Sequence, residues 1–194
     1  MAATPKILAF AGSTRQDSYN QRLVRAAAAG ASGAGADVEV LDLRDFRLPV
    51  FDEDLERDQG PPPPAVALKA RMAESEGFLI ASPEYNSSVT AALKNTIDWV
   101  SRPAPGEAPL VAFRGKAAVL MSASPGALGG LRGLVHLRSI LGNIGVIVLP
   151  DQYLLPRAFE EFAEDGSLRP KPREAAEALG RTLAEFLARY KQAG

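Results

Sequence analysis

The sequence predicts an α/β fold in which helices cover both faces of a parallel sheet. Five short apolar runs of strand length alternate with segments that have helical periodicity. The first run, the helix after it and the second run fit within residues 7–43, and such a βαβ unit requires a parallel pair of strands. We expect the 194 residues to form one domain, 1–194, because the chain is too short for two well-packed ones.

The strands are predicted where apolar runs are too short for a helix and end in turn-forming residues. They are expected at residues 7–10, 38–43, 77–82, 117–121 and 146–149. Pro83 has no N–H group to donate to a neighbouring strand, so the third strand has to end before it.

The helices are predicted from apolar residues spaced three or four apart. They are expected at residues 19–30, 65–74, about 89–100, 131–144 and 173–191, with Ser87 or Ser88 as the cap of the third. The stretch before residue 65 is polar and rich in proline. Its four prolines at 61–64 are interpreted as the first turn of a helix and not as a polyproline ligand, because proline is favoured at that position.

Composition narrows the classes of function. A formal net charge of −1 gives no support for nucleic-acid binding, and it is unlike the acidic surface of a small electron carrier. The chain has no cysteine and one histidine, so we expect no disulfide and no metal site. The N-terminus does not resemble a signal peptide and no apolar run is long enough to span a bilayer, so we expect a cytoplasmic protein without a membrane partner.

Residues 10–20, FAGSTRQDSYN, have the chemistry of an anion-binding loop. Side chains able to hydrogen-bond an oxyanion, with one guanidinium, lie between a strand end and a helix start: Ser13, Thr14, Arg15, Ser18 and Asn20. The loop lacks both the Walker A ending and the glycines of a dinucleotide fingerprint, which favours a terminal monophosphate. The alternative is that Ser18 or Asp17 only caps the helix and that Arg15 is a solvated surface charge.

Three unusual loops follow strands, at residues 12–20, 82–88 and 122–130. In parallel sheets the carboxyl ends of the strands share one edge, where ligands bind. Tyr85 offers a flat ring, Asn86 offers a donor and an acceptor, and Gly126 permits close backbone approach. The three loops together predict a site for a flat heterocycle with a phosphate tail.

Three segments carry a resemblance to a known family: GSTRQDSYN, PEYNSSVTAALKNTIDWVSR and SASPGALGGLRGLVHLRSIL. They resemble the signature segments of the NAD(P)H-dependent FMN reductases, a family of flavodoxin-like fold that includes quinone, chromate and azo-dye reductases. The resemblance extends from residue 7 to about residue 150. Similar proteins often have Pro-Gly where this chain has Thr90 and Ala91.

The resemblance implies a five-stranded sheet of order 2-1-3-4-5, an FMN cofactor, and NADPH or NADH as co-substrate. Hydride would pass from nicotinamide to the flavin, and electrons then to a quinone, an azo compound, a metal oxyanion or free flavin, with no catalytic side chain. It also implies a homodimer or homotetramer, with the helix near residues 93–102 at the interface. The implied FMN contacts are Ser13, Thr14, Arg15, Ser18, Tyr19, Asn20, Pro83, Glu84, Tyr85, Asn86, Ser87, Ser124 and Gly126.

Two other functions compete with this interpretation. SASPG follows a predicted strand and resembles a nucleophile elbow, which would make Ser124 the nucleophile of a hydrolase and His136 its base. The elbow lacks its first glycine, and His136 lies in the next predicted helix, which is the wrong position for a triad. A non-enzymatic electron carrier or flavin redox sensor would share the phosphate loop, and near-neutral charge disfavours the carrier.

Overall fold

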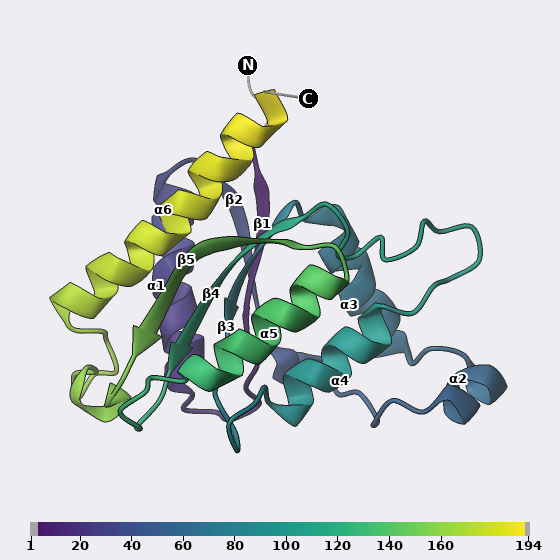
Figure 1. The fold of residues 1–194 in the computed structure, drawn as a ribbon, viewed down its shortest axis with the longest axis horizontal. Helices are drawn as coiled ribbons and strands as arrows, with labels where there is room; N and C mark the ends of the chain where they lie inside the picture. The colour runs from purple at the N-terminus through teal and green to yellow at the C-terminus, as the bar shows by residue number, and fades with distance from the viewer. Residues whose placement is uncertain (1–3, 193–194) are drawn as a thin grey trace.

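Five parallel strands form one sheet of order β2-β1-β3-β4-β5 in the computed structural model, which describes residues 4–192 (Figure 1). The strands are β1 (Lys6–Ala11), β2 (Asp37–Leu41), β3 (Gly77–Ala81), β4 (Ala117–Ala123) and β5 (Ile147–Leu155). Every neighbouring pair is parallel. The predicted fold class and strand order are therefore confirmed.

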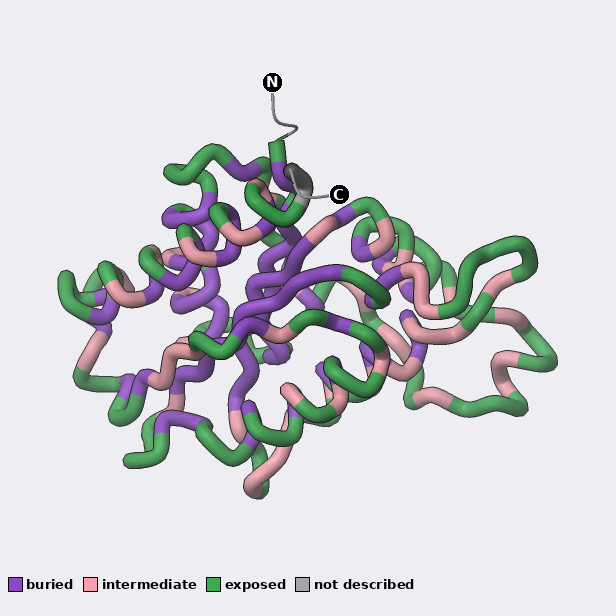
Figure 2. Tube along the Cα trace, turned by 45° about the horizontal axis from the view of Figure 1, so that its top comes forward, coloured by how far each residue is buried: buried purple, intermediate pink, exposed green. Residues whose placement is uncertain are grey.

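Helices cover both faces of this sheet (Figure 1). On one face lie α1 (Tyr19–Gly33) and α6 (Pro170–Gln192), and on the other lie α3 (Pro63–Glu74), α4 (Ala91–Val100) and α5 (Leu131–Asn143). Alternate residues of β1 serve the two layers, because Ile7 and Ala9 pack toward α1 and α6 while Leu8 and Phe10 pack toward the other three helices. Figure 2 shows the buried strands in the middle and exposed turns outside.

The helices α1 and α6 pack with unusually close backbones. A Cβ atom on Gly180 would lie 1.9 Å from the carbonyl oxygen of Ala27, and one on Gly30 would lie 2.0 Å from that of Glu177. Only glycine fits at these two positions. The alanine-rich sequence of α1 is explained by this contact, since larger side chains would hold the helices apart.

Several element boundaries differ from the predicted ones. β2 ends at Leu41, earlier than predicted, because the 3₁₀ helix η1 (Leu43–Asp45) follows and is capped by Asp42. β5 continues to Leu155 through Pro150, which is possible on an edge strand whose ladder is already irregular. A short helix that was not predicted, α2 (Glu53–Gln59), occupies the polar, proline-rich stretch and is capped by Asp52.

The capping residue of α4 is also a correction. Ser87 or Ser88 was expected to cap this helix, but Thr90 does so and its hydroxyl accepts a hydrogen bond from Leu93 N at 3.1 Å. The residues before Thr90 belong to a separate turn. None of the helices within residues 4–192 has the length and apolar character needed to cross a membrane.

Candidate functional site

Residues from three loops meet in a cavity at the carboxyl edge of the sheet. Its walls are Ser13, Arg15, Ser18, Tyr19, Asn20, Pro83, Glu84, Tyr85, Ala123, Ser124 and Pro125. The volume of about 80 Å³ is small beside the roughly 300–1,000 Å³ of complete small-molecule sites, so the cavity suits one end of a ligand. Four predicted site residues lie outside these walls: Asn86, Ser87, Gly126 and Thr14, the last of which faces another cavity.

Ser18 caps α1 and also lines the cavity. It is buried, and its Oγ accepts a hydrogen bond from Gln21 N at 3.4 Å. Ser18, and not Asp17, is therefore the cap of α1. Capping uses an acceptor lone pair, so the hydroxyl still has its proton to donate to an anion.

Asn20 lines the cavity and also has a structural role that was not predicted. Its Nδ2 donates to the carbonyl oxygen of Ala123 at 2.8 Å, and its Oδ1 accepts from Ala123 N at 2.9 Å. Asn20 is buried and joins the start of α1 to the end of β4. The side chain thus fixes two of the three loops relative to each other, with one amide proton left for a ligand.

Arg15 belongs to a stack of four side chains. Its guanidinium lies 5.5 Å from the centre of the Tyr19 ring, which stacks on Phe162 at a centroid distance of 5.1 Å. The guanidinium of Arg22 lies 5.6 Å from the centre of the Phe162 ring. Phe162 follows the 3₁₀ helix η2 (Ala158–Glu160). Sequence reasoning missed Phe162, and the available signal was an aromatic residue inside an otherwise acidic segment.

The loop after β3 forms a tight turn that displays an aromatic ring. Tyr85 N donates to the carbonyl oxygen of Ser88 at 3.0 Å, and Ser88 N donates back to Tyr85 at 3.1 Å. Asn86 and Ser87 between them have φ of 50° and 67°, the left-handed conformations of a type I′ turn. The Tyr85 side chain is exposed and available to a flat ligand.

Glu84 holds this turn onto the first turn of α5. Its carboxylate accepts hydrogen bonds from Arg132 Nε at 2.8 Å and from Gly133 N at 3.1 Å, and its side chain is only 8% exposed. Burial acts to raise the pKa of Glu84, but these hydrogen bonds and the Arg132 charge outweigh burial and hold the pKa below its ordinary value. Glu84 is therefore an ionised link between the loop after β3 and α5.

Thr90 joins the loop after β1 to the start of α4. Besides capping the helix, its hydroxyl donates to the carbonyl oxygen of Gly12 at 2.5 Å. Gly12 is packed so closely that a Cβ atom there would lie 2.9 Å from the side chain of Leu93. The threonine that departs from the pattern of similar proteins thus makes a specific bond to the loop.

The side chains required for a hydrolase are not arranged for one. Ser124 Oγ accepts a hydrogen bond from Gly126 N at 3.1 Å, whereas His136 Nδ1 lies 2.9 Å from Ser88 Oγ. A triad requires the histidine beside its nucleophile. In the part of the chain that the structure describes, no three His, Cys, Asp or Glu side chains gather to hold a metal ion.

Comparisons with known proteins agree on one family. The family model described as NADPH-dependent FMN reductase matches residues 5–160. An NAD(P)H:quinone oxidoreductase from Solanum tuberosum is 42% identical over 177 residues, which are 87% of this chain and 86% of that protein. An NAD(P)H-dependent FMN reductase from Pseudomonas aeruginosa is 36% identical, with 84% of each chain covered.

A solved structure is similar over nearly the whole chain. It is FerB, a flavoenzyme NAD(P)H:(acceptor) oxidoreductase from Paracoccus denitrificans, with a TM-score of 0.78 and 28% identity. The match covers 96% of this chain and 98% of that one.

Proposed function

Because the chain belongs to the NADPH-dependent FMN reductase family, we propose that it passes electrons from reduced nicotinamide through bound FMN to a quinone. The cofactor of the family is FMN, and its chemistry is oxidoreduction. The observation that carries the proposal is the convergence of three loops from β1, β3 and β4 on one cavity. We place the reaction in the cytoplasm.

The first loop fits the phosphate of FMN. Ser13 and Ser18 bring hydroxyl donors to the cavity beside the N-terminus of α1, where partial positive charge favours an anion. Arg15 lines the same cavity and has no acidic partner among residues 4–190, so its charge is available to the ligand. These three residues are proposed to hold the phosphate.

The other two loops fit the flavin ring. Pro83, Tyr85 and Ser124 line the same small cavity, so a ring whose phosphate occupies it would extend outward over the exposed Tyr85 side chain. Bound FMN would supply hydride acceptance and electron delivery, so no acid or base is needed from the protein. The proposed part of these loops is to position the ring and leave one of its faces open.

The surroundings of the cavity favour apolar acceptors. Tyr85 on its wall is exposed, as are Leu128 and Leu131 where the loop after β4 leads into α5. The cation Arg132 is already paired with Glu84. Planar quinones and azo compounds should therefore be reduced more efficiently than chromate or other metal oxyanions, which need a free cation. Free flavin is a further candidate acceptor.

A homodimer through α4 is part of the proposal. The backbone before α2 is tied to α4, because Pro49 O accepts hydrogen bonds from Asn95 Nδ2 and Trp99 Nε1, both at 2.8 Å. Phe51 N also donates to Asn95 Oδ1 at 2.8 Å, and Val50, between Pro49 and Phe51, is 84% exposed. A large apolar side chain on a fixed loop is suited to contact with a second copy. Sedimentation analysis should give a dimer or tetramer, and a monomer at micromolar concentration would contradict this part.

An anaerobic absorbance experiment tests the function. The FMN-loaded protein should lose its flavin band within seconds of adding NADH or NADPH and regain it when a quinone is added. A bound flavin that does not respond would support an electron carrier or sensor instead. Double-reciprocal plots should be parallel if donor and acceptor use the same cleft in turn, and intersecting lines would contradict the shared cleft.

A further inference from the structure

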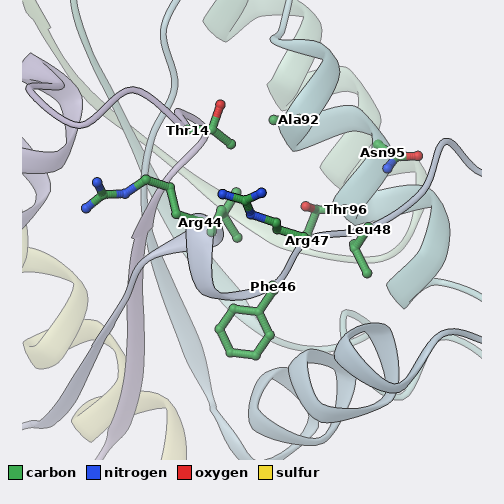
Figure 3. Close-up of a pocket in the computed structure, with 9 residues that line it drawn as sticks. Thr14, Arg44, Phe46, Arg47, Leu48, Ala92, Asn95 and Thr96 are labelled. Atoms are coloured by element: carbon green, nitrogen blue, oxygen red, sulfur yellow. The ribbon is translucent and has the colours of Figure 1, made fainter.

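A second cavity borders the loop after β1 at Thr14 (Figure 3). Its volume of about 490 Å³ is within the roughly 300–1,000 Å³ range of small-molecule sites. It is lined by Thr14, Leu43, Arg44, Phe46, Arg47, Leu48, Ala92, Asn95 and Thr96. Thr14 stands between Ser13 and Arg15, which line the first cavity, so one stretch of backbone separates the two.

The cavity contains one uncompensated positive charge. Arg44 is neutralised by Asp42, to which its Nη2 donates at 2.6 Å. Arg47 is exposed, and neither an ion pair nor a hydrogen bond of its guanidinium is found among residues 4–190. Figure 3 shows the Arg47 guanidinium between Thr14 and Thr96. This charge is available to an anionic ligand.

Among residues 4–190, a second polar group of the cavity, the hydroxyl of a largely buried threonine, also makes no hydrogen bond. Thr96 is only 4% exposed, and within the described residues its side chain makes no hydrogen bond, although it lines the cavity. In Figure 3 its oxygen points toward Arg47. Ala92, in the first turn of α4, lines the same space, and that helix N-terminus adds partial positive charge. The Thr96 hydroxyl is therefore free to donate a hydrogen bond to an anionic ligand in the cavity.

We propose that this cavity binds the adenosine 2′-phosphate end of NADPH. The phosphate would contact Arg47 and Thr96, and the apolar side chains Leu43 and Leu48 would contact the adenosine. The nicotinamide end would cross the loop at Thr14 to reach the first cavity. The choice of NADPH as ligand rests on the proposed function. Contact with the 2′-phosphate would make the chain selective for NADPH over NADH, which lacks this phosphate.

The first test is calorimetry of the FMN-loaded protein with 2′,5′-ADP and with 5′-AMP, which needs no turnover. Wild type should bind 2′,5′-ADP more tightly than 5′-AMP. In Arg47→Ala the affinity for 2′,5′-ADP should fall about ten- to a hundredfold, the usual contribution of a charge-assisted hydrogen bond, and the ratio of KM for NADPH to KM for NADH should rise similarly. Arg57→Ala is the matched control, because Arg57 is an exposed arginine on the nearby α2 that is paired with acidic neighbours.

The outcomes separate the subsite from the proposed function. If 2′,5′-ADP binds selectively but neither donor bleaches the flavin, the reductase proposal fails and the subsite stands. Equal binding of the two nucleotides, or equal effects of Arg47→Ala on both donors, would overturn the subsite. A change in sedimentation of Arg47→Ala together with unchanged nucleotide binding would also overturn it, because a second copy would then cover the cavity.

Discussion

The guanidinium of Arg15 is held in place by an aromatic ring and not by an acidic side chain, so its charge is not neutralised. Its guanidinium rests against the Tyr19 ring at 5.5 Å, and Tyr19 rests on Phe162. An acidic neighbour would hold the guanidinium equally well but would cancel its charge. Aromatic contact restricts the side chain and leaves the charge available to a phosphate.

The stacking of Phe162 on Tyr19 predicts that Phe162, although outside the three loops, affects the affinity for FMN more than the affinity for riboflavin. Phe162→Leu keeps apolar bulk but removes the stacking on Tyr19, so the Kd for FMN should rise about three- to tenfold, the typical contribution of an aromatic pair. The Kd for riboflavin, which has no phosphate, should change little. Fluorescence titration measures both constants. Phe159→Leu is the control, since that ring is exposed, and equal losses for both flavins in Phe162→Leu would refute the positioning role.

Glu84 predicts a pH-dependent contribution to stability. Its pKa is lowered in the folded protein, so its stabilising effect is present above the ordinary value of 4.5 and is lost as pH falls through the lower folded-state pKa. Glu84→Gln should lower the free energy of unfolding by about 1–2 kcal/mol at neutral pH.

Urea unfolding at a series of pH values checks this expectation. The difference between wild type and Glu84→Gln should shrink in acid as the wild-type carboxylate becomes protonated. Glu185→Gln is the control, because it breaks only an exposed ion pair with Arg189. A difference that stays constant into the acid range would show that the charge of Glu84 does not stabilise the link to α5.

At the scale of elements, buried strands were predictable and the segments that join them were less so. Leu79 and its neighbours in β3 form a wholly buried apolar run, and its short length and the following Pro83 favour a strand over a helix. Thr90 took the capping role from Ser87 and Ser88, because those two lie in or beside a tight turn that the sequence did not distinguish from a helix start. The sequence analysis ended β5 before Pro150, because proline is not expected inside a strand. Proline is tolerated there because β5 is an edge strand, and the sequence did not show that position.

The contact between α1 and α6 predicts a large cost for one added methyl group. In Gly180→Ala the new Cβ atom would lie 1.9 Å from the carbonyl oxygen of Ala27, so the helices must separate. The free energy of unfolding should fall by about 1–3 kcal/mol, as in other overpacked sites. Gly33→Ala in α1 is the control. No atom lies within 4 Å of its added Cβ, so it should be neutral or raise stability by up to about 1 kcal/mol. Chemical denaturation measures the free energy of unfolding of both variants. Equal changes in Gly180→Ala and Gly33→Ala would contradict the close packing of α1 and α6.

At the scale of the whole molecule, the site is assembled by contacts that join distant parts of the chain. The meeting of three loops could be predicted, because parallel topology places strand ends together. The bonds that fix them could not, since Asn20 reaches Ala123 and Thr90 reaches Gly12 across large sequence separations. The same limit applies to Phe162, whose contact with Tyr19 depends on the path taken after β5. Polar residue types predicted an anionic ligand, and the structure shows which of these residues line the cavity and which of them also fix the loops.

Because the site joins segments from the whole sheet, its ligand should stabilise the entire domain. A ligand that binds only the folded state at a concentration of one hundred times its Kd adds about 2.7 kcal/mol, and for a chain of this size that raises Tm by roughly 5–10 °C. Removal of FMN should therefore lower Tm by this amount, and adding FMN back should restore it. Differential scanning calorimetry with FMN and riboflavin, each at the same multiple of its own Kd, should give equal shifts in Tm. At equal concentration FMN should give the larger shift, because we propose that its phosphate binds Arg15 and the start of α1. Equal shifts at equal concentration would show that the phosphate contributes nothing and that the first loop has been assigned the wrong ligand.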